Sequence, residues 1–143
     1  MSDSFCVDRH RESFLELIDE YVDIVFCNES EVLSLFKKDK LANCQEDLSF
    51  LCELVIVTLG SNGSLIVNNN NVEIIESITK GKIIDTTGAG DIYAGGFIHG
   101  LINNCSLKKC GEIASICAGQ IITQLESRSD INLKELIKRN LII

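Results

Sequence analysis

The residues best suited to chemistry stand together in one stretch, Asp85-Thr86-Thr87-Gly88-Ala89-Gly90-Asp91. A short apolar run precedes it at 82–84, and an apolar helical pattern follows over 92–103. The three small residues at 88–90 allow a ligand to approach the backbone closely. The first N–H groups of a helix have no partner within it, and the helix dipole adds positive charge there. The stretch therefore predicts a glycine turn that opens a helix and binds an anion, most suitably a phosphate.

Asp91 falls within the first turn of that predicted helix. A carboxylate that faces the anion site can take a proton from a hydroxyl group that attacks phosphorus. An acidic residue at this position also stabilises a helix without any function, so the residues alone leave both interpretations open. The stretch is not a Walker motif, because no Gly-Lys-Ser/Thr follows, and it lacks the glycine spacing of a dinucleotide fingerprint.

The composition indicates a single globular domain. The chain has 143 residues, of which 45% are hydrophobic, and no run is as long as a membrane span. The start has no basic segment followed by an apolar one, so no signal peptide is predicted. The net charge of −8 argues against a nucleic acid partner, although not against a nucleotide. We therefore expect a cytoplasmic protein that has neither a membrane nor a nucleic acid as its partner.

The cysteines favour a reduced interior. There are seven of them, an odd number, and none forms a Cys-x-x-Cys pair. The two histidines, His10 and His99, are far apart in the sequence. Most of the cysteines lie in apolar patterns, which is typical of buried thiols in a cytosolic protein and not of a disulfide framework or a zinc site.

The elements that must position the glycine turn alternate between helices and strands. Hydrophobic patterns predict strands at 23–27, 54–58, 64–67 and 72–75, and helices at 9–21, 29–36, 39–51, 92–103, 107–125 and 133–140. Asp8, Asn28, Ser106 and Asn132 are placed to cap four of these helices. This alternation predicts a three-layer α/β/α domain with a mainly parallel sheet.

Two shorter motifs follow predicted strands. Asn28 and Glu31 are three residues apart, which predicts a capping box at the start of a helix. A helix start at the carboxyl end of a strand also lies where ligands gather in open α/β sheets, so both readings can hold together. Gly60 and Gly63 lie in a turn after the strand 54–58, and turn geometry alone is enough to explain them.

These motifs together resemble a known family. The string from Asp85 to Asp91, followed by Tyr93-Ala94-Gly95-Gly96-Phe97, resembles the signature of the ribokinase-like (PfkB) sugar and nucleoside kinases. The segment 23–31 resembles the Asn-x-x-Glu element of that family, and 58–63 resembles its Thr-x-Gly-x-x-Gly loop. The similarity runs from about Asp23 to the end of the chain, and within the family the bacterial adenosine-kinase-like members look most similar.

The resemblance implies roles for individual residues. It makes Asp91 the catalytic base and the amides of Gly88, Ala89 and Gly90 an anion hole. The implied ligands are ATP, Mg²⁺ and a monovalent cation such as K⁺. Nucleotide contacts are implied for Thr58, Gly60, Gly63, Asn28, Thr86 and Thr87; Mg²⁺ contacts, largely through water, for Asn28 and Glu31; and a monovalent-cation contact for Asp85.

The resemblance also implies an incomplete enzyme. The chain, 1–143, is similar only to the C-terminal half of the family's kinase domain, without the half that carries the Gly-Gly substrate motif and the lid. We expect an ATP-dependent phosphotransferase acting on a hydroxymethyl group of a sugar or nucleoside such as ribose or adenosine. A sheet that lacks neighbours exposes an edge, which implies a homodimer or a complementing N-terminal chain.

Two alternatives belong to other classes. Beside the kinase hypothesis, the chain could be a non-catalytic remnant or an interaction module. Such a protein would keep the fold and nucleotide binding without phosphoryl transfer. A reductase with a Rossmann site is disfavoured, because the glycine spacing differs and the motif lies late in the chain.

Overall fold

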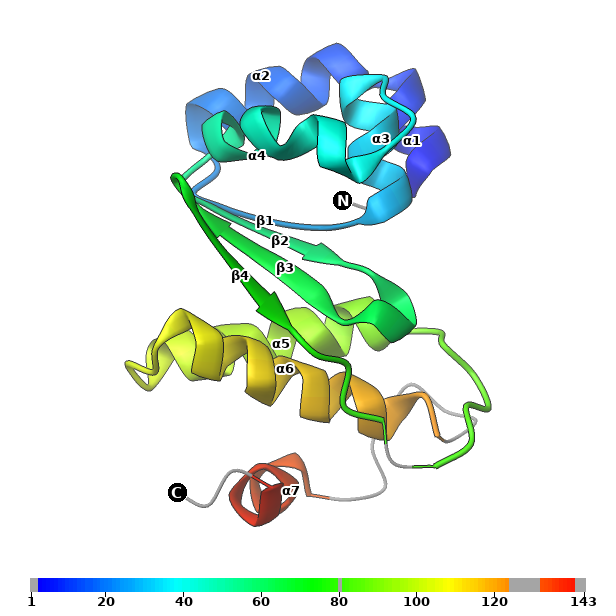
Figure 1. Cartoon of the computed structure of the whole chain (residues 1–143), viewed down its shortest axis with the longest axis vertical. Coiled ribbons are helices and arrows are strands. Elements are labelled where there is room, and N and C mark those ends of the chain that lie inside the picture. Colours follow the sequence, from blue (N-terminus) through cyan, green and yellow to red (C-terminus); the bar gives the residue numbers. More distant parts are fainter. Residues whose placement is uncertain (1–2, 80, 124–131, 141–143) are drawn as a thin grey trace. The chain divides into compact units, whose positions relative to one another are not determined.

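The structure is a computed structural model that describes residues 3–79, 81–123 and 132–140 (Figure 1). The chain divides into two compact units, which are described separately: Met1–Leu59 with Ser64–Ile74, and Gly60–Gly63 with Ile75–Ile143. The elements of the first unit are α1 (Ser4–Arg9), α2 (Arg11–Tyr21), β1 (Ile24–Asn28), α3 (Glu29–Phe36), η1 (Leu41–Cys44), α4 (Gln45–Leu51), β2 (Leu54–Thr58), β3 (Ser64–Asn68) and most of β4 (Asn71–Ile75). Those of the second are η2 (Gly60–Asn62), α5 (Ala89–Ile102), α6 (Leu107–Ile121) and α7 (Leu133–Asn140).

The four strands form one sheet in the order β1-β2-β3-β4. Strands β1 and β2 are parallel, with Asn28 opposite Thr58, whereas β2 and β3 are antiparallel, with Thr58 opposite Ser64. The described sheet is therefore mixed, where we expected a mainly parallel one. The reason is the connection 59–63, because a parallel connection needs a crossover of a dozen or more residues and this turn is far shorter.

The core of the first unit lies between the sheet and helices α1–α4, which gather on one side of the sheet (Figure 1). Strand β2 is the continuous β-branched run expected from the sequence, and its residues 54–57 are all buried. Inward side chains from every layer form one cluster: Ile18, Val25, Cys27, Val32, Cys44, Leu48, Val55, Val57 and Val67. Burying each large aliphatic side chain contributes about 1.5–3 kcal/mol, so this cluster accounts for much of the stability of the unit.

The N-terminal helix differs from the prediction. A single helix over 9–21 capped by Asp8 was expected, but the structure has two helices. Asp3 caps α1 by accepting a hydrogen bond from the Cys6 amide at 2.8 Å, and Val7 of that helix is fully buried. The predicted helix over 39–51 is likewise divided, into η1 and α4. The predicted end of the helix that begins after Ser106 lies outside the described residues, since α6 is described to Ile121.

In the second unit, α5 and α6 lie side by side (Figure 1). A Cβ on Gly96 would lie 2.9 Å from the Ala114 Cα, and one on Gly100 would lie 2.9 Å from the Cys110 Cα. The close packing expected of the helix glycines is thus confirmed for these two. Gly95 differs, because a Cβ there would meet nothing within 4 Å. Helix α7 contributes Ile137 to a buried group with residues of α6.

All seven cysteines are free thiols. Four are buried and three are partly buried, and burial raises the pKa of Cys27 to about 12, so that thiol stays protonated at neutral pH. Within the described residues, none of the helices has the length and apolar character needed to span a membrane.

Candidate functional site

The glycine turn forms as the sequence predicts. Gly88 has φ +77° and stands immediately before α5, in the left-handed region that favours glycine. Asp85 Oδ1 accepts hydrogen bonds from the Thr87 amide at 2.9 Å and from Thr87 Oγ1 at 2.8 Å. The Ala89 amide donates to the Thr86 oxygen at 3.2 Å. The Asp85 side chain thus shapes the loop that leads into the helix.

The amino end of α5 has the features of an anion site. Among the described residues no side chain caps this helix, so its first-turn N–H groups need another acceptor. A Cβ on Gly90 would meet nothing within 4 Å, which leaves the backbone open to a ligand. Asp91 lies in the same first turn, and its side chain is exposed. The Ala89 amide is already used within the loop, so the geometry favours the other first-turn amides as anion donors.

Helix α6 holds the segment that enters this loop, which the sequence analysis did not predict. The carbonyl oxygen of Ile122, at the end of α6, accepts from the amides of Ile84 at 2.8 Å and Asp85 at 3.3 Å. Farther back along the helix, Ser115 Oγ donates to the Glu76 oxygen and accepts from the Ile78 amide, both at 2.9 Å. Ser115 is 6% exposed. Hydrogen bonds to α6 thus hold the described residues Glu76 and Ile78, and bonds to Ile122 hold Ile84 and Asp85.

Gly119 makes this close approach possible. A Cβ at this position would lie 1.8 Å from the Ile78 carbonyl oxygen, so no larger residue fits. The only sequence signal was a pair of small residues, Ser115 and Gly119, one helical turn apart within a buried face. That pattern is common at any helix contact, and it did not identify the segment that packs there.

We expect Ser115→Ala to lower the free energy of unfolding by about 1–3 kcal/mol, because it removes two part-buried hydrogen bonds that contribute about 0.5–1.5 kcal/mol each. The measurement is urea denaturation of the purified chain. Ser49→Ala is the matched control, since Ser49 Oγ donates to the Gln45 oxygen of its own helix, at 3.0 Å, and does not join distant segments. A loss in Ser115→Ala no larger than that of the control would show that α6 does not hold the segment through this hydroxyl.

The carboxylate of Asp85 responds to these hydrogen bonds. The amide and hydroxyl of Thr87 hold the pKa of Asp85 below its usual range. Its contribution to loop stability is therefore fully present above the unfolded value of about 3.9 and is lost as the pH falls through the lowered folded-state pKa. We expect the Thr87 amide to remain protected from hydrogen exchange at pH 5 and to lose protection only in stronger acid. If the Thr87 amide exchanged equally fast at pH 5 and in the stronger acid, after correction for intrinsic rates, the link between the Asp85 carboxylate and this amide would be contradicted.

Asn28 and Glu31 form the predicted capping box. Asn28 Oδ1 accepts from the Glu31 amide at 2.9 Å, and Glu31 Oε2 accepts from the Asn28 amide at 2.9 Å. Asn28 is exposed, whereas Glu31 is 2% exposed. Thr58 stands opposite Asn28 at the carboxyl end of the neighbouring parallel strand, and its Oγ1 donates to the Cys27 oxygen at 3.3 Å. The structure thus brings these three predicted residues together.

The glycines of the 59–63 turn are required by the backbone. Gly60 has φ +58° and Gly63 has φ +87°, and the Gly63 amide donates to the Gly60 oxygen at 3.1 Å. A Cβ on Gly63 would also lie 1.9 Å from the Ile75 oxygen. Turn geometry therefore accounts for both glycines, and their contact with a nucleotide stays a prediction.

The predicted residues form two sets, one on each unit. Asp85 to Asp91 lie with Gly60 and Gly63 on the second unit, and Asn28, Glu31 and Thr58 lie on the first. Among the described residues, no three His, Cys, Asp or Glu side chains are grouped to hold a metal ion. The oxygens of Asn28 and Glu31 fit Mg²⁺ that is bound mainly through its water shell, because both side chains already accept backbone bonds.

Comparison with known proteins identifies the family. Residues 2–134 match the model described as pfkB family carbohydrate kinase. The chain belongs to this family. A nucleoside kinase from Methanocaldococcus jannaschii is 34% identical over 113 residues, which cover 78% of this chain and 36% of that protein.

Solved structures of the same family show the same fold. A probable sugar kinase from Rhizobium etli is 38% identical with a TM-score of 0.95, and the match covers 99% of this chain and 43% of that one. For the adenosine kinase from Sinorhizobium meliloti the identity is 37% and the TM-score 0.94, over 97% and 43% of the two chains. A ribokinase from Arabidopsis thaliana, solved with ribose and ATP, is 25% identical with a TM-score of 0.75, over 86% and 43% of the chains. The pfkB chain therefore has a ribokinase-like α/β fold and spans less than half the length of these relatives.

Proposed function

We propose that this pfkB chain is the part of an ATP-dependent sugar or nucleoside kinase that binds the nucleotide and supplies the catalytic base. The observation that carries the proposal is the uncapped start of α5 at 88–90, with an exposed Asp91 in its first turn. An uncapped helix start accepts phosphate, and the adjacent carboxylate can accept a proton. The ribokinase of Arabidopsis thaliana, which was solved with ribose and ATP, supports this choice of ligands.

In the proposed reaction, Asp91 takes the proton of a hydroxymethyl group on the sugar or nucleoside. The hydroxyl oxygen then forms a bond to the γ-phosphorus of ATP, the bond from that phosphorus to the bridging oxygen breaks, and ADP leaves. The amides of Gly88 and Gly90 at the start of α5, together with that of Ala89 once it leaves the Thr86 oxygen, stabilise negative charge on the transferring group. Phosphoryl transfer depends mainly on positioning and electrostatics. The hydrogen bonds that hold the entrance of this loop against the end of α6 therefore matter for the rate.

The remaining residues have supporting roles. Bound Mg²⁺ would neutralise phosphate charge, with Asn28 and Glu31 ordering its water shell. Thr58, Gly60, Gly63, Thr86 and Thr87 would contact the nucleotide, and Asp85 would shape the loop and help to hold a monovalent cation such as K⁺. Adenosine and ribose are the acceptors that we favour, and ATP as substrate fits a cytoplasmic location. Residues 1–143 would be the C-terminal part of the kinase domain, completed by an N-terminal half or by a second copy.

Calorimetric titration of the purified chain with magnesium-ATP tests the proposal. We expect saturable binding with a stoichiometry near one. Gly90→Glu should weaken binding by at least about tenfold, because it places a negative charge at the proposed phosphate site. The new Cβ would meet nothing within 4 Å, so the substitution causes no clash at that atom. Gly95→Glu is the matched control on the same helix, at a position that is equally open, and it should bind as the unmodified chain does.

Failure to bind magnesium-ATP by a folded sample would contradict the nucleotide role. It would favour the second candidate, a non-catalytic remnant or interaction module. One observation favours this second candidate. The chain is short relative to its relatives, since the match covers 36% of the Methanocaldococcus jannaschii protein.

A further inference from the structure

An open groove of about 610 Å³ lies in the first unit between α2 and α4. Its lining combines two kinds of side chain in equal number: Leu15, Phe36, Phe50 and Leu51 are apolar, and Glu16, Asp19, Glu46 and Asp47 are acidic. None of these residues belongs to the set assigned to nucleotide or catalysis. The groove therefore needs an explanation of its own.

The apolar part of the groove is continuous with the core. Phe36 and Leu51 are partly buried and pack against the main cluster of the first unit. Phe50 differs from them, because it is 78% exposed although it belongs to the same lining. A large aromatic side chain that is exposed at the edge of an apolar groove is typical of a binding surface.

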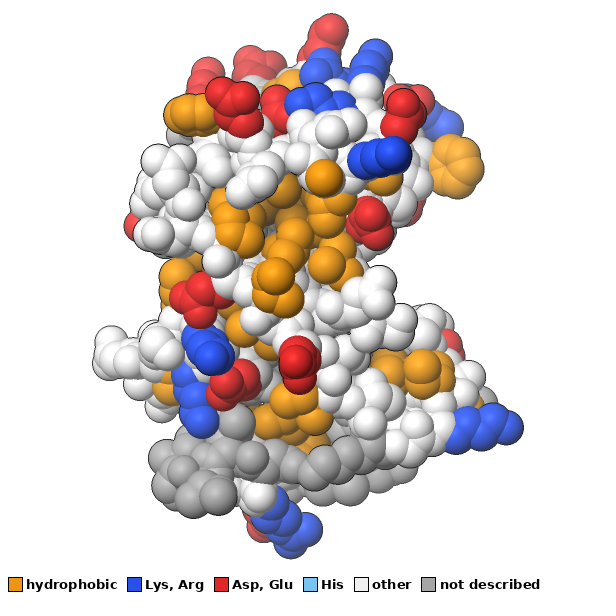
Figure 2. Space-filling view, viewed as in Figure 1, with side chains coloured by type: hydrophobic (Ala, Val, Ile, Leu, Met, Phe, Trp, Pro, Cys, Tyr) orange, Lys and Arg blue, Asp and Glu red, His pale blue; other side chains and the backbone are white. Residues whose placement is uncertain are grey.

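The acidic part of the groove lies on both sides. Glu16 and Asp19 come from α2, and Glu46 and Asp47 come from α4. On each helix a carboxylate and an apolar lining residue are four positions apart, as Leu15 and Asp19 on α2 illustrate. This spacing puts both on one face of the helix. Figure 2 shows acidic side chains, interspersed with basic ones, over the helices of this unit.

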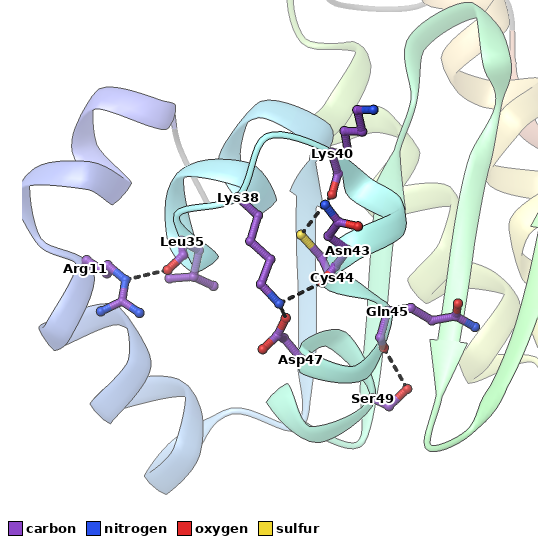
Figure 3. Close-up of polar contacts among 9 residues, drawn as sticks. All are labelled: Arg11, Leu35, Lys38, Lys40, Asn43, Cys44, Gln45, Asp47 and Ser49. Carbon is purple, nitrogen blue, oxygen red and sulfur yellow. Dashed lines mark hydrogen bonds and ion pairs between the residues drawn. The ribbon is translucent and has the colours of Figure 1, made fainter.

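Of the four carboxylates that line the groove, only Asp47 pairs with a basic residue within the described part of the chain. Lys38 pairs with Asp47 and also donates to the Asn43 oxygen at 2.7 Å (Figure 3). Arg11 donates instead to the Leu35 oxygen (Figure 3). Among the lining carboxylates, Glu16, Asp19 and Glu46 have no ion pair in the described part of the chain.

We propose that this groove docks a cationic amphipathic helix of a partner protein. Such a helix would insert an aliphatic or aromatic side chain beside Phe50 and place Lys or Arg against the carboxylates on both sides. Charge complementarity selects this occupant, because nucleic acids and anionic lipid surfaces carry the same sign of charge as the groove. The inference does not depend on kinase activity, since it uses no residue of the proposed catalytic site.

The test uses the full chain and a fluorescent peptide of about four helical turns, with leucines on one face and lysines on the other. We expect saturable binding in an anisotropy titration. Phe50→Ala should weaken it by about tenfold or more, as the loss of an anchoring aromatic contact does. Phe5→Ala is the matched control, because Phe5 is 83% exposed on α1 and does not line the groove, and it should change affinity less than about twofold.

Charge is tested in the same way. The double variant Asp19→Asn/Glu46→Gln should weaken binding by about tenfold and reduce its dependence on salt. Asp8→Asn/Glu53→Gln removes the same charge from exposed residues outside the groove, and it should leave affinity nearly unchanged. No saturable binding, or equal losses in test and control variants, would overturn the proposal. Self-association that Phe50→Ala abolishes would also overturn it, because the occupant would then be a second copy.

Discussion

Asp91→Asn is expected to lower the rate of phosphoryl transfer by roughly 10²–10⁴-fold, the range that a positioned general base contributes. The exposed carboxylate at the start of α5 would lose its ability to accept a proton, while the loop 85–90, which we propose as the phosphate site, stays intact. Affinity for magnesium-ATP should therefore remain unchanged or improve slightly, since a negative charge near the phosphates is removed. The expected signature is a loss in kcat without a loss in nucleotide binding.

A chimera provides the measurement. This chain would replace the matching 43% of the Sinorhizobium meliloti adenosine kinase, with which it is 37% identical. Glu112→Gln is the control, because it neutralises a carboxylate of α6 outside the loop, which pairs with Lys109 at 3.7 Å. Turnover that survives in Asp91→Asn at more than about a tenth of the unmodified rate would remove Asp91 as the base.

Gly119→Ala is expected to lower the free energy of unfolding by about 1–3 kcal/mol, as overpacking of a filled contact does. The new Cβ would lie 1.8 Å from the Ile78 oxygen and 2.9 Å from its carbonyl carbon. Since both atoms belong to the backbone, either the backbone at Ile78 or the helix itself has to move. A shift of α6 would also disturb the hydrogen bonds that the Ile84 and Asp85 amides donate to the Ile122 oxygen at the entrance of the loop, so affinity for the nucleotide should fall as well.

Gly95→Ala is the matched control for this change. It makes the same substitution within a helix, but a Cβ there meets nothing within 4 Å. It should raise the free energy of unfolding by about 0.5–1 kcal/mol through the lower entropy of the unfolded chain. Thermal and urea denaturation of the two variants give the comparison. Equal stability of Gly119→Ala and Gly95→Ala would show that α6 and the segment at Ile78 are not packed as closely as described.

Features that depend on neighbouring residues were predictable from the sequence. The capping box at Asn28, the buried strand 54–58, the cap at Ser106 and the glycine turn at 88–90 all appear where they were predicted. Each of these is set within about one helical turn or one strand, where residue type and spacing act directly on the backbone. The family signature belongs to the same class, because the residues that form it are contiguous.

Features that join distant segments became visible only in the folded chain. Ser115 bonds to Glu76 and Ile78, residues 39 and 37 positions away, and that contact leaves no periodic trace in the sequence. The two helices at the N-terminus depend on the burial of Val7, and the groove beside Phe50 depends on how α2 and α4 pack. A side chain carries its own propensity, but the partner that it meets is chosen by the global fold. That is why the local motif was predictable and the support behind it was not.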